Sequence, residues 1–129
     1  MLRTMLVAAA CLGLAGCNAG GSAPSANLPA LNVAFKWCAA GSPTFTVGGL
    51  PKDAKTLRFK LVDRDAPAWN HGGGEVPAAA SIPCGAISGG YNGPNPPSGQ
   101  VHTYEWTVTA LNASGAAIAS GTAARKYPE

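Results

Sequence analysis

Three residues in the middle of the chain carry side chains that could do acid–base or binding chemistry: Asp63, His71 and His102. They are one carboxylate and the only 2 histidines of the chain, and each adjoins a segment rich in glycine or proline. A carboxylate beside an imidazole can orient the ring and stabilise its charged form, and a charged imidazole attracts anions. Residues of these types could form a polar site if the fold brings them together.

The first element that must position one of these side chains is a strand from Thr56 to Asp63. Its apolar residues occupy every second position, which is typical of a half-buried strand. Asp63 continues the parity of Leu61, so its carboxylate is predicted to point inward at the end of the strand. Because a buried carboxylate is costly unless it is paired or opens to a cleft, Asp63 either binds a ligand or caps backbone amides. Both roles stay open.

The second positioning element is a strand from Val101 to Leu111. His102 has the same parity as Tyr104 and Trp106, so the sequence predicts an inward imidazole at the start of this strand. Two roles are open for His102, a ligand-binding histidine and a core histidine bonded to Asp63 alone. Since both residues lie where a strand meets a loop, we hypothesise a shared pocket at one end of the domain.

The rest of the chain predicts short strands and long loops. Weaker strand patterns cover 33–37, 44–47, 116–119 and 122–127, and no stretch has a sustained helical periodicity. The segments 70–74 and 88–99 contain so many glycines and prolines that we expect no regular structure in them. The predicted fold class is all-β, a β-sandwich with long Gly/Pro-rich loops and little helix.

Several motifs resemble those of the phosphatidylethanolamine-binding protein family, whose bacterial members are called Raf-kinase-inhibitor-like proteins. Residues 63–67, with the sequence DRDAP, look like the DPDAP motif of that family. Residues 90–104 resemble its GY-GP-PP-G-HRY segment, and Ser42-Pro43 with Gly49-Leu50-Pro51 matches its upstream SP…VP stretch. The resemblance covers about Gly41 to Tyr127 and reaches the last predicted strand.

This resemblance implies a β-sandwich with a small pocket for phosphoryl groups of phospholipids or related anions. The positions that match the ligand-binding residues of the family are Asp63, His71, His102 and Tyr104. The chain departs from the family pattern after each histidine, with glycines after His71 and Thr103 in place of the usual arginine. It also lacks the C-terminal helix of the family. The resemblance implies binding without catalysis, and we expect no cofactor.

Other chemistries find less support in the residues. His71 and the glycines after it resemble the oxyanion-hole motif of lipases, but the chain has no G-x-S-x-G nucleophile motif. A metal site from Asp63, His71, Glu75 and His102 is conceivable, but the spacing matches no metal signature, and we expect no metal. The basic residues do not cluster beyond Arg125-Lys126, so no nucleic-acid partner is expected.

The N-terminus resembles a bacterial lipoprotein signal peptide. Arg3 precedes an apolar run that ends in Leu14-Ala15-Gly16-Cys17, a sequence similar to the lipobox of the lipoprotein signal peptidase. We therefore expect residues 1–16 to be cleaved, and Cys17 to accept the lipid that anchors the chain to a membrane. Asn18 favours the outer membrane, with the domain facing the periplasm. The alternative is an ordinary secretory signal with a chance cysteine.

Processing divides the chain into a tether and one domain. Residues 17–30 are predicted to form a lipidated flexible tether, with a reach of roughly 20 Å for a flexible coil. Residues 31–129 are predicted to form the folded domain, in which Cys38 and Cys84 are the remaining thiols. In an oxidising envelope we expect them to form a disulfide, the alternative being two separate buried cysteines.

Two functions of different classes follow from these features. The first is a lipid-anchored envelope protein that binds a small anionic or phosphorylated ligand, of the phospholipid head-group type, in the pocket. The second is a structural lipoprotein, or one that binds an unidentified protein, in which the pocket is vestigial. A concave opening onto which Asp63, His71 and His102 converge favours the first, whereas a filled pocket favours the second.

The lipid anchor is tested by replacing its cysteine. Cys17→Ala should abolish labelling with a radiolabelled fatty acid and release the protein from membranes, because the thiol is the acceptor of the lipid. Cys11→Ala, within the signal peptide, is the control and should leave labelling intact. Unchanged labelling of the Cys17→Ala protein would rule out the lipoprotein interpretation.

Overall fold

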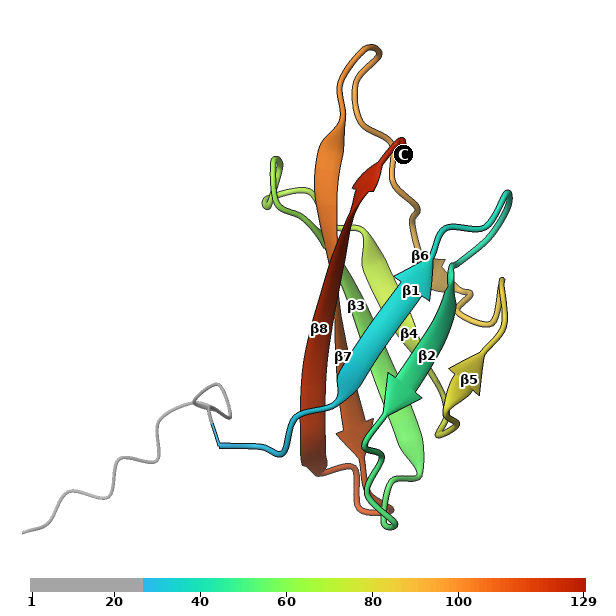
Figure 1. Cartoon of the computed structure of the whole chain (residues 1–129), viewed down its shortest axis with the longest axis vertical. Helices are drawn as coiled ribbons and strands as arrows, with labels where there is room; N and C mark the ends of the chain where they lie inside the picture. The colour runs from blue at the N-terminus through green and yellow to red at the C-terminus, as the bar shows by residue number, and fades with distance from the viewer. Residues whose placement is uncertain (1–26) are drawn as a thin grey trace, which may run out of the picture.

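The computed structural model describes residues 27–129, which form two antiparallel sheets and no helix (Figure 1). The predicted signal peptide, Cys17 and the first part of the predicted tether lie outside the described residues. The three-stranded sheet has the order β1 (Asn32–Lys36), β2 (Thr44–Gly48), β5 (Ser81–Ile82). The five-stranded sheet has the order β6 (Gly90–Tyr91), β4 (Gly72–Pro77), β3 (Thr56–Asp63), β7 (His102–Leu111), β8 (Ala117–Tyr127). The predicted all-β class is confirmed, and the described residues include no helix that could cross a membrane.

The two strands predicted to carry the site lie next to each other at the centre of the larger sheet. β3 spans the predicted residues, and β7 begins at His102, one residue later than predicted, because its pairing with β8 begins at His102↔Tyr127. They pair in unbroken antiparallel register from Thr56↔Leu111 to Asp63↔Tyr104. The predicted alternation therefore holds on both strands, and it places Asp63 close to the start of β7.

The core lies between the two sheets and is built largely of aromatic rings. Phe45 of the smaller sheet contacts Phe59 at 4.7 Å and Trp106 at 5.2 Å between ring centroids, both on the larger sheet. Each of these three residues is at most 2% exposed. Aromatic pairs at such distances add to the free energy of burial. This packing holds the two sheets together beneath the loops that carry the candidate site.

The expectation that segments 70–74 and 88–99 contain no regular structure is wrong in part. Gly72 and Gly73 belong to β4, and Gly90 belongs to β6, which pairs with β4. A Cβ atom at Gly73 would overlap the carbonyl oxygen of Phe59, and one at Gly72 would overlap that of Gly90. The glycines thus allow three backbones to approach closely, which is a known use of glycine within strands.

The C-terminal segment forms one strand, whereas the sequence predicts two. β8 continues through Gly121, where a Cβ atom would overlap the carbonyl oxygen of Leu31. The amide of Leu31 donates to the carbonyl of Ser120 at 2.9 Å, and the amide of Ser120 donates to that of Pro29 at 3.0 Å. Glycine at this position therefore lets the chain before β1 lie against β8. Pro29, which the sequence assigns to the tether, already makes this contact.

The predicted pairing of Cys38 with Cys84 is confirmed, with 6.1 Å between the two Cα atoms. The disulfide joins the β1–β2 loop to the segment that follows β5. Ser42, which is fully buried, reinforces this link: its carbonyl accepts from the amide of Gly85, and its hydroxyl accepts from the amide of Ile87, each at 3.0 Å. The chain then continues into β6 and the loop that leads to β7.

Removing the disulfide should lower stability without changing the fold. Closing a loop of 46 residues stabilises by about 4 kcal/mol in the chain-entropy model. Cys38→Ser with Cys84→Ser should therefore lower the free energy of unfolding by up to about this amount, as measured by urea denaturation. Peptide mapping without reductant should find the two cysteines linked in the native protein. Alkylation of both thiols in the folded, non-reduced protein would contradict the pairing.

Candidate functional site

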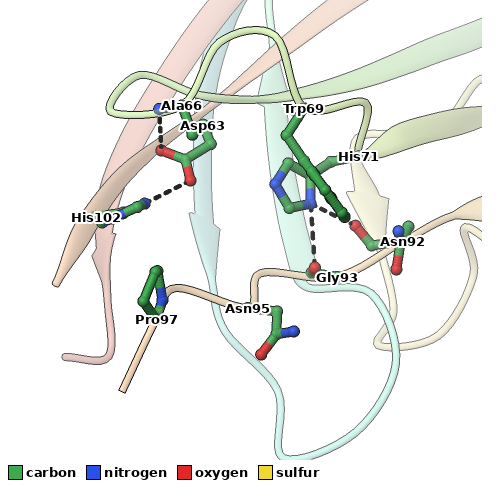
Figure 2. A pocket seen from close by; sticks show the side chains of 9 residues that line it. All are labelled: Asp63, Ala66, Trp69, His71, Asn92, Gly93, Asn95, Pro97 and His102. Carbon is green, nitrogen blue, oxygen red and sulfur yellow. Dashed lines mark hydrogen bonds and ion pairs between the residues drawn. The ribbon is translucent and has the colours of Figure 1, made fainter. Parts of the chain in front are cut away.

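The candidate site lies at the end of the sandwich where the turn after β3 and the loop from β6 to β7 come together (Figure 1). These two segments enclose an open cavity of about 390 Å³. Figure 2 shows Asp63 and His102 on one side of it and His71 on the other. The residues that line the cavity are Asp63, Ala66, Trp69, His71, Asn92, Gly93, Asn95, Pro97 and His102.

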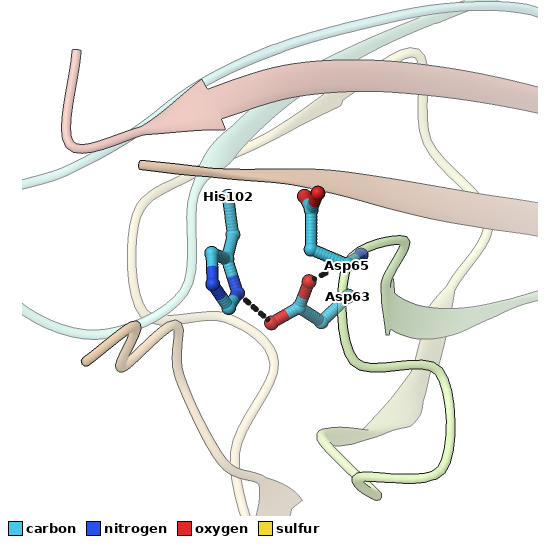
Figure 3. Close-up of side chains that lie close together, drawn as sticks. All are labelled: Asp63, Asp65 and His102. Atoms are coloured by element: carbon cyan, nitrogen blue, oxygen red, sulfur yellow. Dashed lines mark hydrogen bonds and ion pairs between the residues drawn. The ribbon is translucent and has the colours of Figure 1, made fainter. Parts of the chain in front are cut away.

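Asp63 is 3% exposed, and both of its carboxylate oxygens accept hydrogen bonds. Oδ1 accepts from the backbone amides of Asp65 at 2.9 Å and Ala66 at 3.2 Å. Oδ2 accepts from Nδ1 of His102 at 2.6 Å (Figure 3). Of the two roles left open by the sequence, the structure places Asp63 in that of a cap for backbone amides, which also holds an imidazole. Its oxygens are engaged before any ligand arrives.

These contacts decide the charge of Asp63. Burial alone raises the pKa of this carboxyl, but the hydrogen bonds from His102 and from the amide of Asp65 outweigh burial and hold the pKa below its ordinary value. Asp63 is therefore a carboxylate at neutral pH, and its charge faces the ring of His102 rather than the open part of the cavity.

His102 is 9% exposed and has a partner on each ring nitrogen. Nδ1 donates to Asp63, because a carboxylate can only accept. Nε2 lies 2.9 Å from the side-chain oxygen Oε1 of Gln100. His102 is thus more than a core histidine bonded to Asp63 alone, since its second nitrogen contacts an exposed residue of the β6–β7 loop.

His71 holds the opposite wall of the cavity and is 3% exposed. Its Nδ1 lies 2.9 Å from the carbonyl oxygen of Asn92 and 3.1 Å from that of Gly93. Because carbonyl oxygens only accept, Nδ1 carries a proton. Nε2 makes no hydrogen bond to any described residue, and it faces the side of Asp63 and His102 in Figure 2. His71 therefore offers one ring nitrogen to a ligand.

Tyr104, the fourth residue implied by the family resemblance, is fully buried and does not line the cavity. Its ring lies between the two imidazoles, 5.3 Å from that of His71 and 6.3 Å from that of His102. Burial, followed by the negative charge of Asp63, raises the pKa of Tyr104 to about 12, so its hydroxyl stays neutral. This hydroxyl makes no hydrogen bond to any described residue. From the buried core, the ring of Tyr104 packs against both histidine rings.

The turn after β3 and the start of β7 bring together three side chains that could ligate a metal ion. Ligand atoms of Asp63, Asp65 and His102 lie within 4.8 Å of one another (Figure 3). However, the Asp65 carboxylate accepts from the amide of Thr103 at 2.7 Å, so it ties the turn to the start of β7. Glu75, which the conceivable metal set included, pairs with Arg58 at 2.8 Å and does not line the cavity.

Sequence reasoning missed several residues of the site. Trp69, Asn92, Asn95 and Pro97 line the cavity, and Gln100 contacts His102. Trp69 is 64% exposed. Its position in a loop was a signal, because a large apolar residue between a turn and a glycine run has no core to enter. The asparagines and Gln100 had no such signal, since polar residues in loops are common.

Among the described residues that line the cavity, the imidazoles are the only potential cations. No lysine or arginine of the described residues lines the cavity. An anion bound here would depend on protonated histidine and on neutral hydrogen-bond donors such as the side-chain amides of Asn92 and Asn95. The arrangement can bind and orient a small anion. None of the lining residues is a serine, threonine or cysteine that could act as a nucleophile.

The chain has a partial match among curated proteins. The chain is 37% identical over 92 residues to a UPF0098 protein of Methanothermobacter thermautotrophicus, which covers 55% of this chain. The chain spans about 60% of the length of that relative. No protein-family model matches the chain.

The pairing of Asp63 makes stability depend on pH. Since the pKa of Asp63 is lowered on folding, its contribution is present above the ordinary pKa of aspartate, about 4, and is lost as pH falls through the folded value. Asp63→Asn should therefore lower the free energy of unfolding at pH 7 by about 3 kcal/mol, because it leaves His102 without its charged partner. The difference from wild type should shrink as pH falls below the ordinary pKa of aspartate, about 4.

Urea denaturation at several pH values measures this effect. Asp53→Asn is the matched control, because Asp53 is an exposed acid before β3, and it should change stability little at any pH. Equal stability of Asp63→Asn and wild type at pH 7 would contradict the role assigned to the pair.

Proposed function

We propose that this chain binds a small anionic or phosphorylated ligand, of the phospholipid head-group type, in the cavity between His71 and His102. The binding is non-catalytic and needs no cofactor. The observation that carries the proposal is the state of His71: a buried imidazole whose Nδ1 is held by two carbonyls and whose Nε2 faces an open cavity. A ring anchored in this way is oriented before the ligand arrives, which reduces the entropy lost on binding.

The size and chemistry of the cavity support a small anion. A volume of about 390 Å³ lies at the lower end of the range for small-molecule sites. When protonated, Nε2 of His71 donates a charge-assisted hydrogen bond, the kind that binds phosphoryl oxygens best. The exposed ring of Trp69 at the rim offers apolar contact to whatever group carries the anion.

The resemblance to the phosphatidylethanolamine-binding protein family points to the same function. The partial match to a UPF0098 protein is compatible with that resemblance. The contribution of this chain's own residues is narrower than the resemblance implies. His71 is the residue available for direct contact, Asp63 positions His102, and Tyr104 supports the two rings from beneath.

We propose further that the chain acts as a lipid-anchored protein of the cell envelope, on the outer membrane and facing the periplasm. This part of the proposal rests on the N-terminal sequence and on the disulfide, which suits an oxidising compartment. The rival function, a structural or protein-binding lipoprotein, predicts a pocket filled by side chains. The open cavity between the histidines favours the ligand-binding function.

Ligand binding is tested by removing the free imidazole nitrogen. His71→Gln keeps an amide donor near the carbonyls of Asn92 and Gly93 but removes the charge. It should weaken binding of inorganic phosphate and O-phosphoethanolamine at least about tenfold, as measured by calorimetry.

Thr107→Ala is the control for this experiment. Thr107 alternates with the buried residues of β7, pairs with Lys60, and lies on the other face of the sheet, so its loss should leave affinity unchanged. If wild type and His71→Gln bind equally, or if neither binds either probe, the proposed function is wrong.

A further inference from the structure

His102 lines the cavity, but both of its ring nitrogens already have hydrogen-bond partners. The bond from Nδ1 to Asp63 is short, at 2.6 Å, and buried, and its acceptor is fixed by two backbone amides. The partner of Nε2 is Gln100, which is an exposed residue. A ligand that reaches His102 must replace one of these partners, and Gln100 is the easier one to displace.

We infer that Gln100 is an internal competitor for the ligand: its side-chain amide occupies Nε2 of His102, the ring nitrogen that an anion would bind when the imidazole is protonated. This inference rests on the proposed function and deepens it by naming the residue that sets the affinity. Ligand binding and the contact between Gln100 and His102 exclude each other at Nε2. The side chain of Gln100 has to leave His102 before the second histidine can contribute.

An amide is suited to this role by its two ends. Its oxygen accepts from a charged imidazole, and its nitrogen can donate to a neutral one, so Gln100 can satisfy Nε2 in either state. The charged oxygen atoms of an anion accept, so they compete with Gln100 for the Nε2–H of the charged imidazole. A charged imidazole binds an anion more strongly than a neutral amide. The contact with Gln100 is therefore one that a suitable ligand can break.

The contact is separable from the fold. The backbone amide of Gln100 donates to the carbonyl of Pro97 at 2.9 Å, and this bond does not involve the side chain. Within the described part of the chain, the side chain of Gln100 makes no hydrogen bond other than the one to His102. Substitutions at Gln100 should therefore leave the loop and the sandwich in place.

Three variants of the purified full chain test the inference. Gln100→Ala removes the competitor and should tighten binding of inorganic phosphate and O-phosphoethanolamine about tenfold in calorimetry. Gln100→Glu keeps the length of the side chain but places a carboxylate on His102, and it should weaken binding at least about tenfold. Ser98→Ala, an exposed neighbour in the same loop, is the matched control and should bind like wild type.

A spectroscopic measurement separates competition from a structural effect. In long-range proton–nitrogen NMR spectra at constant pH, saturating phosphate should shift the Nε2 resonance of His102 in wild type. Gln100→Ala should change the ligand-free position of that resonance, and Ser98→Ala should not.

The outcomes distinguish this inference from the proposed function. Binding to Gln100→Ala that is tighter than binding to wild type supports the inference. If wild type binds and Gln100→Ala binds no more tightly, the inference is wrong, while the proposed function stands on His71. If phosphate binds without moving the Nε2 resonance of His102, the inference is likewise wrong. Absence of binding in both wild type and Gln100→Ala overturns both proposals.

Discussion

A buried carboxylate has to be neutralised by its surroundings, and in this domain that requirement organises one whole end of the sandwich. Asp63 ends β3 on the inner face, where an unpaired charge would cost several kcal/mol. Its oxygens receive two backbone amides and the ring of His102. The same three contacts bend the chain after β3 and tie that turn to the start of β7. If the turn moved, the carboxylate of Asp63 would lose its hydrogen-bond partners or become exposed.

The second wall of the cavity is set by backbone rather than by charge. Gly72 and Gly73 bring β4 so close to its neighbours that no side chain fits between them. β4 in turn begins directly after His71, whose carbonyl accepts from the amide of Asn92 at 2.8 Å while its ring donates back to the same loop. The imidazole is held in place because its Nδ1 hydrogen-bonds to two carbonyl groups of this loop. The wall with Asp63 and His102 thus depends on a buried charge. The wall with His71 depends on glycines, whose lack of a side chain lets the strands approach.

This difference explains what the sequence could and could not predict. Alternation on β3 and β7 predicts inward positions for Asp63 and His102, because parity along a strand is a local property. The glycines of β4 and β6 carry no such pattern, so they were predicted to lie in loops. The family resemblance implies that His71 binds the ligand, but no alternation of apolar residues predicts where its side chain points. The contact between Gln100 and His102 depends on how a loop enters a strand, which no pattern of residue types specifies.

The two histidines therefore enter the site in different states, and the cause is the buried carboxylate. Asp63 binds one nitrogen of His102, and Gln100 covers the other, so this ring is part of the folded structure before it is part of any binding site. His71 is anchored by carbonyl groups, which carry no net charge, and its second nitrogen stays available. An anion that enters can bind the free Nε2 of His71 directly, and it gains the second imidazole only by displacing Gln100. Stability and affinity are thus divided between two residues of the same type, since the histidine that neutralises the core charge already has a partner on each ring nitrogen.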